Sequence, residues 1–186
     1  MLKRAYQWRG TLVAPPVLFS AVCFWHEYEN ELLTWVVGIS VFLAGWALRI
    51  WAQQHLGYRL TRQRALTISG PYAMVRNPIY LGNTLVVLGV VVASEVIWMV
   101  PCTILWCAGV YTLVTRYEEQ RLTEKYGEDY LAYTAAVPRW VPRLAHSRTA
   151  VRQRPALRPA LFAELHVVLV LAPVVVKALI LARFIE

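Results

Sequence analysis

Charged residues are scarce in this chain. They make up 16% of its 186 residues, against about 25% in a typical soluble domain. Hydrophobic residues make up 58%, and the mean hydropathy of +0.45 excludes an ordinary soluble protein. The sequence also lacks low-complexity segments and internal repeats. We therefore expect one all-α membrane domain over residues 1–186, built as a polytopic transmembrane helix bundle.

Cysteine is scarce as well. Cys23, Cys102 and Cys107 all fall in apolar segments and lack the spacing of metal ligands. We interpret them as small apolar packing residues and expect neither a disulfide nor a metal site. The N-terminus lacks an A-x-A-like cleavage site after its basic start and apolar run. We therefore interpret it as an uncleaved first helix and not as a secretory signal.

Acidic residues are few, 11 against 19 lysines and arginines, which gives a net charge of +8. The basic residues flank apolar segments and do not line one polar face. This pattern favours contacts with anionic membrane lipids over binding of nucleic acid. The turns near residues 26–31 and 94–95 hold no basic residue. The positive-inside rule therefore predicts a multi-pass protein of the cell (inner) membrane, with the N-terminus and both motif loops in the cytoplasm.

The sequence contains about five apolar segments that we interpret as spans, and a span needs roughly 17–25 residues. We place them near residues 10–25, 32–51, 79–93, 96–115 and 159–181. The first and third are short for this role. Five spans would put the C-terminus outside the cell, and residues 159–182 would form an additional C-terminal transmembrane helix.

The first polar motif is residues 70–82 (GPYAMVRNPIYLG), directly before the third apolar segment. Gly70 begins a turn, Asn77 is a favoured helix N-cap, and Pro78 suits the first helical position. A well-capped membrane helix with a snorkelling arginine would explain the pattern. A functional alternative is an anion site formed by the helix N-terminus and Arg76, with aromatic faces from Tyr72 and Tyr80.

The second motif is residues 117–122 (YEEQRL), which follow the fourth apolar segment. Carboxylates of Glu118 and Glu119 at the C-terminus of a helix would oppose its dipole. They could pair with Arg116, Arg121 or Arg62, or bind a cationic or hydroxyl-rich ligand, which we favour.

Two further stretches follow this motif. Leu122, Tyr126, Tyr130 and Tyr133 form an amphipathic stripe interrupted by Gly127. This pattern predicts cytoplasmic amphipathic helices that lie on the membrane or cap the bundle. Residues 137–143 (VPRWVPR) are typical of an extended segment anchored at the interface by its aromatic residue and arginines.

Together these stretches resemble the integral-membrane methyltransferases of the isoprenylcysteine carboxyl methyltransferase and phospholipid methyltransferase superfamily. Members carry a G-x-Y-x-x-x-R-H-P-x-Y-x-G segment, then paired glutamates, an F/Y-G-E-x-Y-x-x-Y stretch and a V-P-x-x-x-P ending. Here those stand at residues 70–82, 118–119, 126–133 and 137–142. The resemblance covers residues 49–143, which we regard as the methyltransferase-like core.

The resemblance implies S-adenosylmethionine as the cofactor and a lipophilic small molecule or membrane lipid as the acceptor. Prenylated cysteine, a phospholipid amine, an isoprenoid acid and a small thiol all remain open as acceptors. Carried over by position, the cofactor-binding residues would be Leu66, Thr67, Tyr72, Arg76, Asn77, Pro78, Tyr80, Glu118 and Glu119.

One position departs from the family pattern, because Asn77 stands where the usual residue is histidine. Asparagine cannot take up a proton near neutral pH, so this side chain cannot be a general base. An anionic acceptor needs no base, whereas an amine would need another group to take its proton or would have to arrive neutral. We assign no catalytic residue and expect direct in-line displacement.

Two other functions stay open. Sterol-type membrane reductases that use NADPH share an R-H-P-x-Y-x-G segment, but an acidic residue commonly follows its glycine, and here that residue is Asn83. A non-catalytic membrane scaffold is the other alternative.

Four polar residues inside the apolar segments have no role in this scheme. We expect Glu164, His166 and Lys177 to snorkel toward the membrane surfaces. Arg49 could face the site.

Overall fold

The computed structural model describes residues 2–24, 31–58, 66–143 and 157–185. Within these ranges the chain is helical and contains no strand, which confirms the all-α prediction. The elements, in chain order, are α1 (Leu2–Gln7), η1 (Thr11–Val13), α2 (Ala14–Val22), α3 (Glu31–Tyr58), η3 (Gly70–Ala73), α4 (Pro78–Ala93), α5 (Met99–Tyr126), α6 (Glu128–Ala136), α7 (Leu157–Glu164), η4 (Leu165–Leu171) and α8 (Ala172–Ile185).

Three of the described helical stretches are long and apolar enough to cross a membrane. They are Glu31–Leu56, Met99–Tyr126 and Leu157–Arg183. Two shorter apolar helices, Thr11–Val22 and Pro78–Ala93, accompany them. These five stretches correspond to the five predicted apolar segments, and the two short ones are those that the sequence also marks as short.

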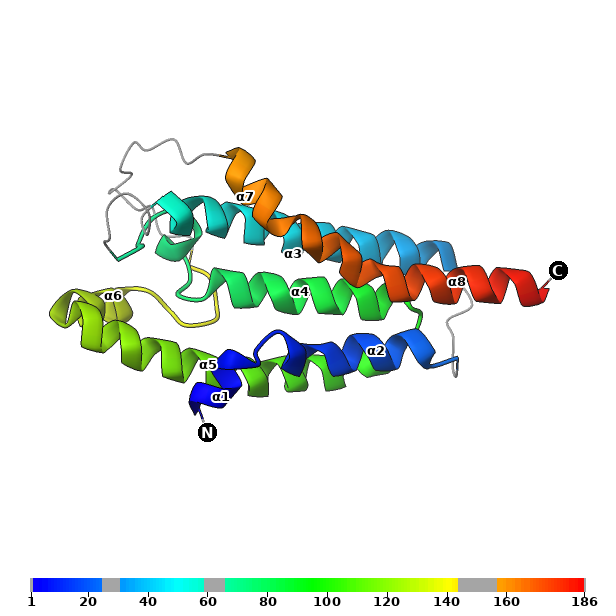
Figure 1. The fold of residues 1–186 in the computed structure, drawn as a ribbon, viewed down its shortest axis with the longest axis horizontal. Coiled ribbons are helices and arrows are strands. Elements are labelled where there is room, and N and C mark those ends of the chain that lie inside the picture. The colour runs from blue at the N-terminus through cyan, green and yellow to red at the C-terminus, as the bar shows by residue number, and fades with distance from the viewer. Residues whose placement is uncertain (1, 25–30, 59–65, 144–156, 186) are drawn as a thin grey trace.

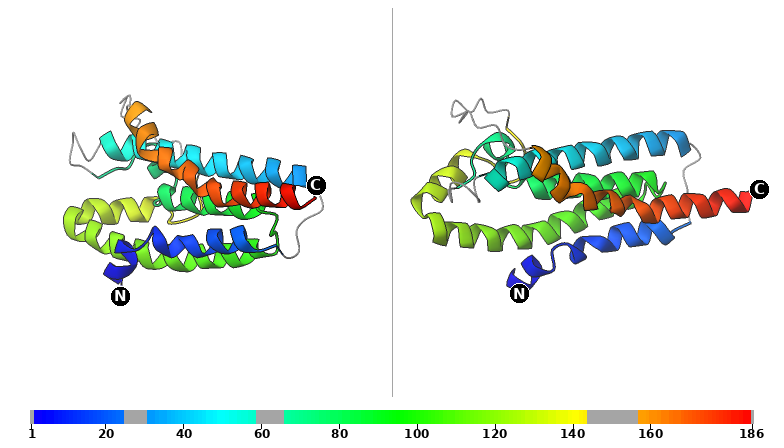
Figure 2. Two further views of the ribbon diagram at one scale, coloured as in Figure 1. Left: turned by 45° about the vertical axis from the view of Figure 1, so that its right-hand side comes forward. Right: turned by 45° about the horizontal axis from the view of Figure 1, so that its top comes forward.

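The apolar helices run roughly side by side, with α4 between α3 and α5 (Figures 1 and 2). At one end of the bundle lie the C-terminus of α3, the N-terminus of α4 and the C-terminal part of α5, together with α6. We call this the motif end, because residues 70–82 and 117–122 both reach it. The opposite end, called the far end, holds the turn that begins at Ser94.

The closest contact in the bundle is between the backbones of α3 and α4, which run antiparallel. A Cβ added to Gly38 would lie 2.7 Å from the Gly89 carbonyl oxygen. A Cβ on Gly45 would lie 2.7 Å from the Gly82 carbonyl oxygen. Each helix thus presents two glycines seven residues apart on one face. Small residues at such positions allow membrane helices to approach closely and gain packing energy.

The C-terminal apolar stretch is tied to this core by two buried charged side chains. Glu164 of α7 is 1% exposed and accepts from Arg49 Nε at 2.6 Å. Lys177 of α8 is 3% exposed, and its Nζ donates to the Ser94 carbonyl oxygen at 2.9 Å. The prediction that Glu164 snorkels is therefore wrong, because its carboxylate finds its partner inside the bundle. Lys177 reaches the turn at the far end, and its snorkelling stays a prediction. His166 is exposed.

Helix α5 is longer than the sequence predicted. The fourth apolar segment was expected to end near residue 115, with the paired glutamates at a helix C-terminus. Instead the helix continues to Tyr126, because residues 116–126 contain good helix formers and no glycine or proline. Gly127, with φ of 54°, ends it in a conformation that suits glycine. Glu118 and Glu119 therefore lie inside a helix, and the predicted conflict with its dipole is wrong.

We expect Gly45→Ala to lower the apparent melting temperature of the detergent-purified protein. Alanine favours a helix over glycine by about 0.5–1 kcal/mol, but overpacking a tight contact costs about 1–3 kcal/mol. The control is Gly109→Ala on α5, where an added Cβ meets nothing within 4 Å. That variant should melt at or above the wild-type temperature in the same fluorescence scan. A Gly45→Ala protein as stable as the control would contradict the close helix contact.

Candidate functional site

The first motif begins with a turn that is docked on the end of α3. Gly70 has a φ of 62°, which disfavours any residue with a side chain. A Cβ there would also lie 2.4 Å from His55 Nε2. The His55 ring makes a hydrogen bond through Nδ1 with Ser69 Oγ at 3.1 Å. The glycine therefore both permits the turn and lets it rest against α3.

Helix α4 begins at Pro78, as predicted, and Asn77 is the residue before it. The Asn77 side chain, however, makes no capping hydrogen bond with the helix. Its Nδ2 instead donates to the Arg139 carbonyl oxygen at 3.4 Å. The capping role predicted for this side chain is wrong, because the segment after α6 engages its amide.

That segment, residues 137–143, is not extended as predicted, because the chain bends at residue 137 and at residues 139–141 where it packs on the first motif. The Arg76 amide donates to the Pro138 carbonyl oxygen at 2.9 Å, and the Arg143 amide donates to the Met74 carbonyl oxygen at 2.9 Å. Trp140 packs against the core cluster. Two stretches more than sixty residues apart therefore run together at the motif end.

Glu119 joins these stretches to the second motif. One of its carboxylate oxygens, Oε1, accepts from Arg76 Nη1 at 3.2 Å and from Arg139 Nε at 3.0 Å. The other, Oε2, accepts from Arg139 Nη2. Such a two-point contact fixes the orientation of both side chains. Of the partners predicted for the two glutamates, neither Arg116 nor Arg121 pairs with Glu119, and Arg62 lies outside the described residues.

Arg139 is a residue that sequence reasoning missed. Its signal was present, since it stands in the V-P-x-x-x-P ending, but nothing in the spacing shows which carboxylate it meets. Arg76 is only partly engaged by Glu119: its Nε is buried and has no hydrogen-bond partner among the described residues. A buried N–H without a partner is rare, and it calls for an acceptor atom.

Glu118 is directed to other partners than its neighbour, because successive residues of a helix are about 100° apart. It interacts electrostatically with Tyr80 of α4 and with Arg9 and Arg121. The Tyr80 ring in turn lies 4.9 Å from that of Tyr111, centroid to centroid. Tyr111 and Arg9 were also missed, since neither belongs to a motif.

A group of three tyrosines completes the motif end. The Tyr133 hydroxyl donates to the Tyr72 carbonyl oxygen at 2.8 Å, and the Tyr130 and Tyr133 rings lie 5.9 Å apart. Tyr130 is 3% exposed, so the stripe on α6 faces the protein and caps the bundle.

The same three phenols stay protonated at neutral pH. Burial, reinforced by the carboxylate of Glu119, raises the pKa of Tyr130 to about 12. Burial also raises the pKa of Tyr72 and Tyr133 above the usual phenol value. These hydroxyls can donate hydrogen bonds but do not serve as bases.

The remaining predicted residues lie nearby. Leu66 and Thr67 precede the Gly70 turn, and Thr67 is buried. Their role in lining a nucleoside stays a prediction. The structure thus brings Arg76, Asn77 and Glu119 together through Arg139, and it places Tyr80 beside Glu118.

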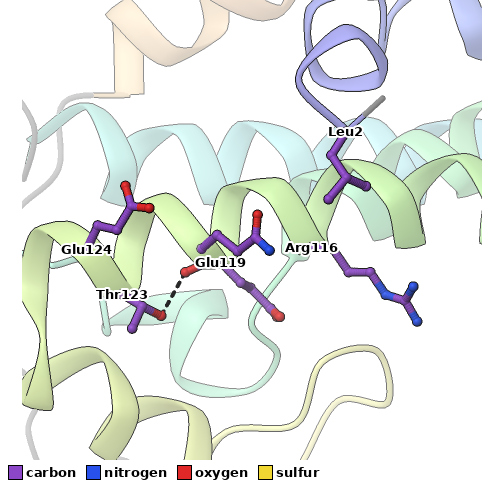
Figure 3. A pocket seen from close by; sticks show the side chains of 6 residues that line it. Leu2, Arg116, Glu119, Thr123 and Glu124 are labelled. Atoms are coloured by element: carbon purple, nitrogen blue, oxygen red, sulfur yellow. Dashed lines mark hydrogen bonds between the residues drawn. The ribbon is translucent and has the colours of Figure 1, made fainter.

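An open hollow of about 680 Å³ lies next to this cluster, beside α5 and the start of α1 (Figure 3). It is lined by Leu2, Arg116, Glu119, Gln120, Thr123 and Glu124. The Thr123 hydroxyl donates to the Glu119 carbonyl oxygen at 2.8 Å. Only Glu119 is shared with the predicted site, so the converging side chains, and not this hollow, define the candidate site. No group of three potential metal ligands occurs in the described part of the chain.

Comparison with known proteins gave one family and two curated relatives. The sequence model described as "Phospholipid methyltransferase" matches residues 33–129. The cobalt-zinc-cadmium resistance protein CzcN of Cupriavidus metallidurans is 27% identical over 139 residues, which are 75% of this chain and 55% of that protein. The nickel-cobalt-cadmium resistance protein NccN of Alcaligenes xylosoxydans xylosoxydans is 27% identical over 151 residues, covering 76% and 66% respectively.

The chain thus spans just over half to about two thirds of the length of these relatives. No solved structure matches the chain.

The ion pairs of Glu119 give a prediction for stability. Glu119→Gln removes the carboxylate that two arginines share and leaves their charges facing each other. A hydrogen bond to a charged group contributes about 1.5–3 kcal/mol, but these side chains are partly exposed. We therefore expect the lower part of that range, a fall of a few degrees in melting temperature.

Glu124→Gln, on the same helix but outside this cluster, is the matched control and should change the melting temperature by less than a degree or so. Equal effects of the two substitutions would show that Glu119 does not hold the site together.

Proposed function

The chain belongs to the phospholipid methyltransferase family, and we propose that it transfers the methyl group of S-adenosylmethionine to a lipophilic or membrane-embedded acceptor. The observation that carries this proposal is the meeting of both polar motifs at one end of an apolar helix bundle. A site there can take a water-soluble cofactor from one side and a lipid-soluble acceptor from the other.

The side chains at the motif end fit the groups of such a cofactor. The buried Arg76 Nε offers a hydrogen-bond donor without a partner, which suits an oxygen of the cofactor carboxylate. Glu118 offers a carboxylate beside Tyr80 for a cationic group or a ribose hydroxyl. Tyr72, Asn77 and Pro78 lie in the same loop and helix start. Leu66 and Thr67 would line the adenosine.

When bound, S-adenosylmethionine would supply a methyl group on a positively charged sulfur, which is already activated for displacement. The protein then has to position the reactants and exclude water. Such positioning can lower a barrier by about 7–11 kcal/mol, and a dry pocket avoids solvating charges that neutralise each other. The Glu119–Arg139 contact holds the motif loop in one conformation, which serves this positioning.

Neither Asn77 nor the tyrosines of the candidate site can act as a base. Asn77 cannot take up a proton, and the raised pKa values keep Tyr72 and Tyr133 protonated. An acceptor that is already anionic, such as a carboxylate or thiolate, needs no base. An amine would have to arrive in its neutral form or give its proton to another group, such as the Glu118 carboxylate.

We further propose that the motif end faces the cytoplasm. In the sequence, the basic residues gather in the N-terminal tail and in the stretches that adjoin the two motifs, and the positive-inside rule predicts that such stretches lie on the cytoplasmic side. The acceptor would reach the site sideways from the membrane, between the helices.

Calorimetric titration with S-adenosylhomocysteine tests the cofactor. We expect micromolar binding to the detergent-purified protein, because this product keeps the nucleoside and amino-acid groups of the cofactor. Glu118→Ala should weaken binding at least tenfold, since a lost charged hydrogen bond is worth about 1.5–3 kcal/mol. Glu124→Ala, on the same helix, should leave the affinity unchanged.

An intact, monodisperse protein that fails to bind S-adenosylhomocysteine would refute the proposal. Binding of NADPH by the same preparation would then point to a reductase, and binding of neither to a non-catalytic role.

A further inference from the structure

The ion pair between Arg49 and Glu164 lies inside the apolar part of the bundle. Their side chains are 12% and 1% exposed, and 2.6 Å separates Arg49 Nε from Glu164 Oε2. Trp46 Nε1 donates to the Glu164 carbonyl oxygen at 3.0 Å. A buried ion pair is weak evidence for added stability, because removing both charges from water offsets most of their attraction. Ionisable residues within a membrane point first to function.

The two partners come from different parts of the chain. Arg49 lies on α3, within residues 33–129 that match the family, and Glu164 lies on α7, outside that match. Arginine stays protonated in proteins, so its charge needs an anion wherever it is buried. Glu164 supplies that anion from a segment that the family match does not include.

Arg49 also packs against the first motif. Its stem fills the space that a side chain on Gly82 would occupy, since a Cβ there would be 2.7 Å from Arg49 Cγ. Arg49 interacts electrostatically with Tyr111, whose ring stacks on Tyr80. Tyr80 interacts with Glu118. A row of polar side chains therefore leads from the proposed cofactor site to Arg49.

Glu164 stands at a break in the C-terminal helix. It is the last residue of α7, and the seven residues Leu165–Leu171 that follow form a 3-10 helix before α8 begins. Pro173, which has no amide hydrogen, contributes to this break. A 3-10 stretch of such length inside a longer helix is uncommon and often marks a hinge. Lys177 meanwhile anchors α8 to Ser94 at the far end.

From these observations we propose that Arg49 binds the anionic head group of a membrane amphiphile. The Glu164 carboxylate occupies the place of that head group when no ligand is bound, and the ligand displaces it. The ligand would carry a carboxylate or phosphate at Arg49 and an apolar chain along the lipid-facing helices. Glu164 would leave by movement of α7 about η4, with α8 held in place. The position of this ligand next to a methyl donor rests on the proposed function.

Binding of defined amphiphiles, measured by native mass spectrometry of the detergent-purified protein, tests the proposal. The probes are oleate against oleyl alcohol, and dioleoylphosphatidylglycerol against dioleoylphosphatidylcholine. Each pair compares an anionic with a neutral head group. A preference for oleate alone identifies a carboxylate ligand. A preference for phosphatidylglycerol alone identifies a phosphate ligand. A preference for both anionic probes identifies a site that recognises charge.

Three variants show whether Arg49 is responsible. Glu164→Gln removes the competing charge at nearly constant size, so anionic probes should bind about tenfold more tightly. Arg49→Gln should abolish their preference over the neutral probes. Because that change leaves Glu164 buried without its partner, Arg49→Gln/Glu164→Gln serves as the second test. Its two amides can still bond each other, and it should fold yet lack the preference.

The proposal is overturned if the wild type shows no preference for charge, if Glu164→Gln does not tighten binding, or if the double variant keeps the wild-type preference. S-adenosylhomocysteine binding is measured on the same wild-type preparation. If the wild type does not bind S-adenosylhomocysteine but still prefers the anionic probes, the proposed function is refuted and the proposed anion site is supported.

Discussion

The backbone contact between α3 and α4 is the constraint on which the rest of the structure depends. Gly38 and Gly45 on one helix face Gly89 and Gly82 on the other at distances that leave no room for a side chain. This contact fixes the start of α4 beside the end of α3, where the Gly70 turn rests on His55. Gly82 serves twice, because it also makes space for the Arg49 stem. Gly82, the last glycine of the first motif, is therefore required both for the packing of α3 against α4 and for the space that the Arg49 side chain of the Arg49–Glu164 ion pair occupies.

Once α4 is fixed, the two glutamates of α5 acquire different roles from their helical positions. Glu119 is held by Arg76 and Arg139 and joins three separate stretches of the chain. Glu118, one residue earlier, is directed to Tyr80 and Arg9. The first of these arrangements builds the motif end, and the second leaves a carboxylate available to a ligand. The buried Nε of Arg76 adds a donor that the described protein groups do not satisfy.

Local sequence signals predicted the helices, the start of α4 at Pro78 and the break at Gly127. Each of these depends on a proline, a glycine or an apolar run, which act within a few residues. The extension of α5, the partner of the Asn77 amide and the pairs Arg139–Glu119 and Arg49–Glu164 were not predicted. They depend on which residues meet in space, with the last pair 115 positions apart, and a single sequence does not carry that information. The roles of the nine candidate cofactor residues remain predictions.

In the proposed function, this bundle moves a methyl group from a soluble donor to a molecule in the membrane. The most direct measurement adds S-adenosylmethionine with a tritiated methyl group to membranes that contain the protein and counts the label in the organic-solvent extract. We expect label that exceeds the background of membranes without the protein and that falls with Glu118→Ala but not with Glu124→Ala. Label at background level, from protein shown to be folded and abundant in those membranes, would contradict the account.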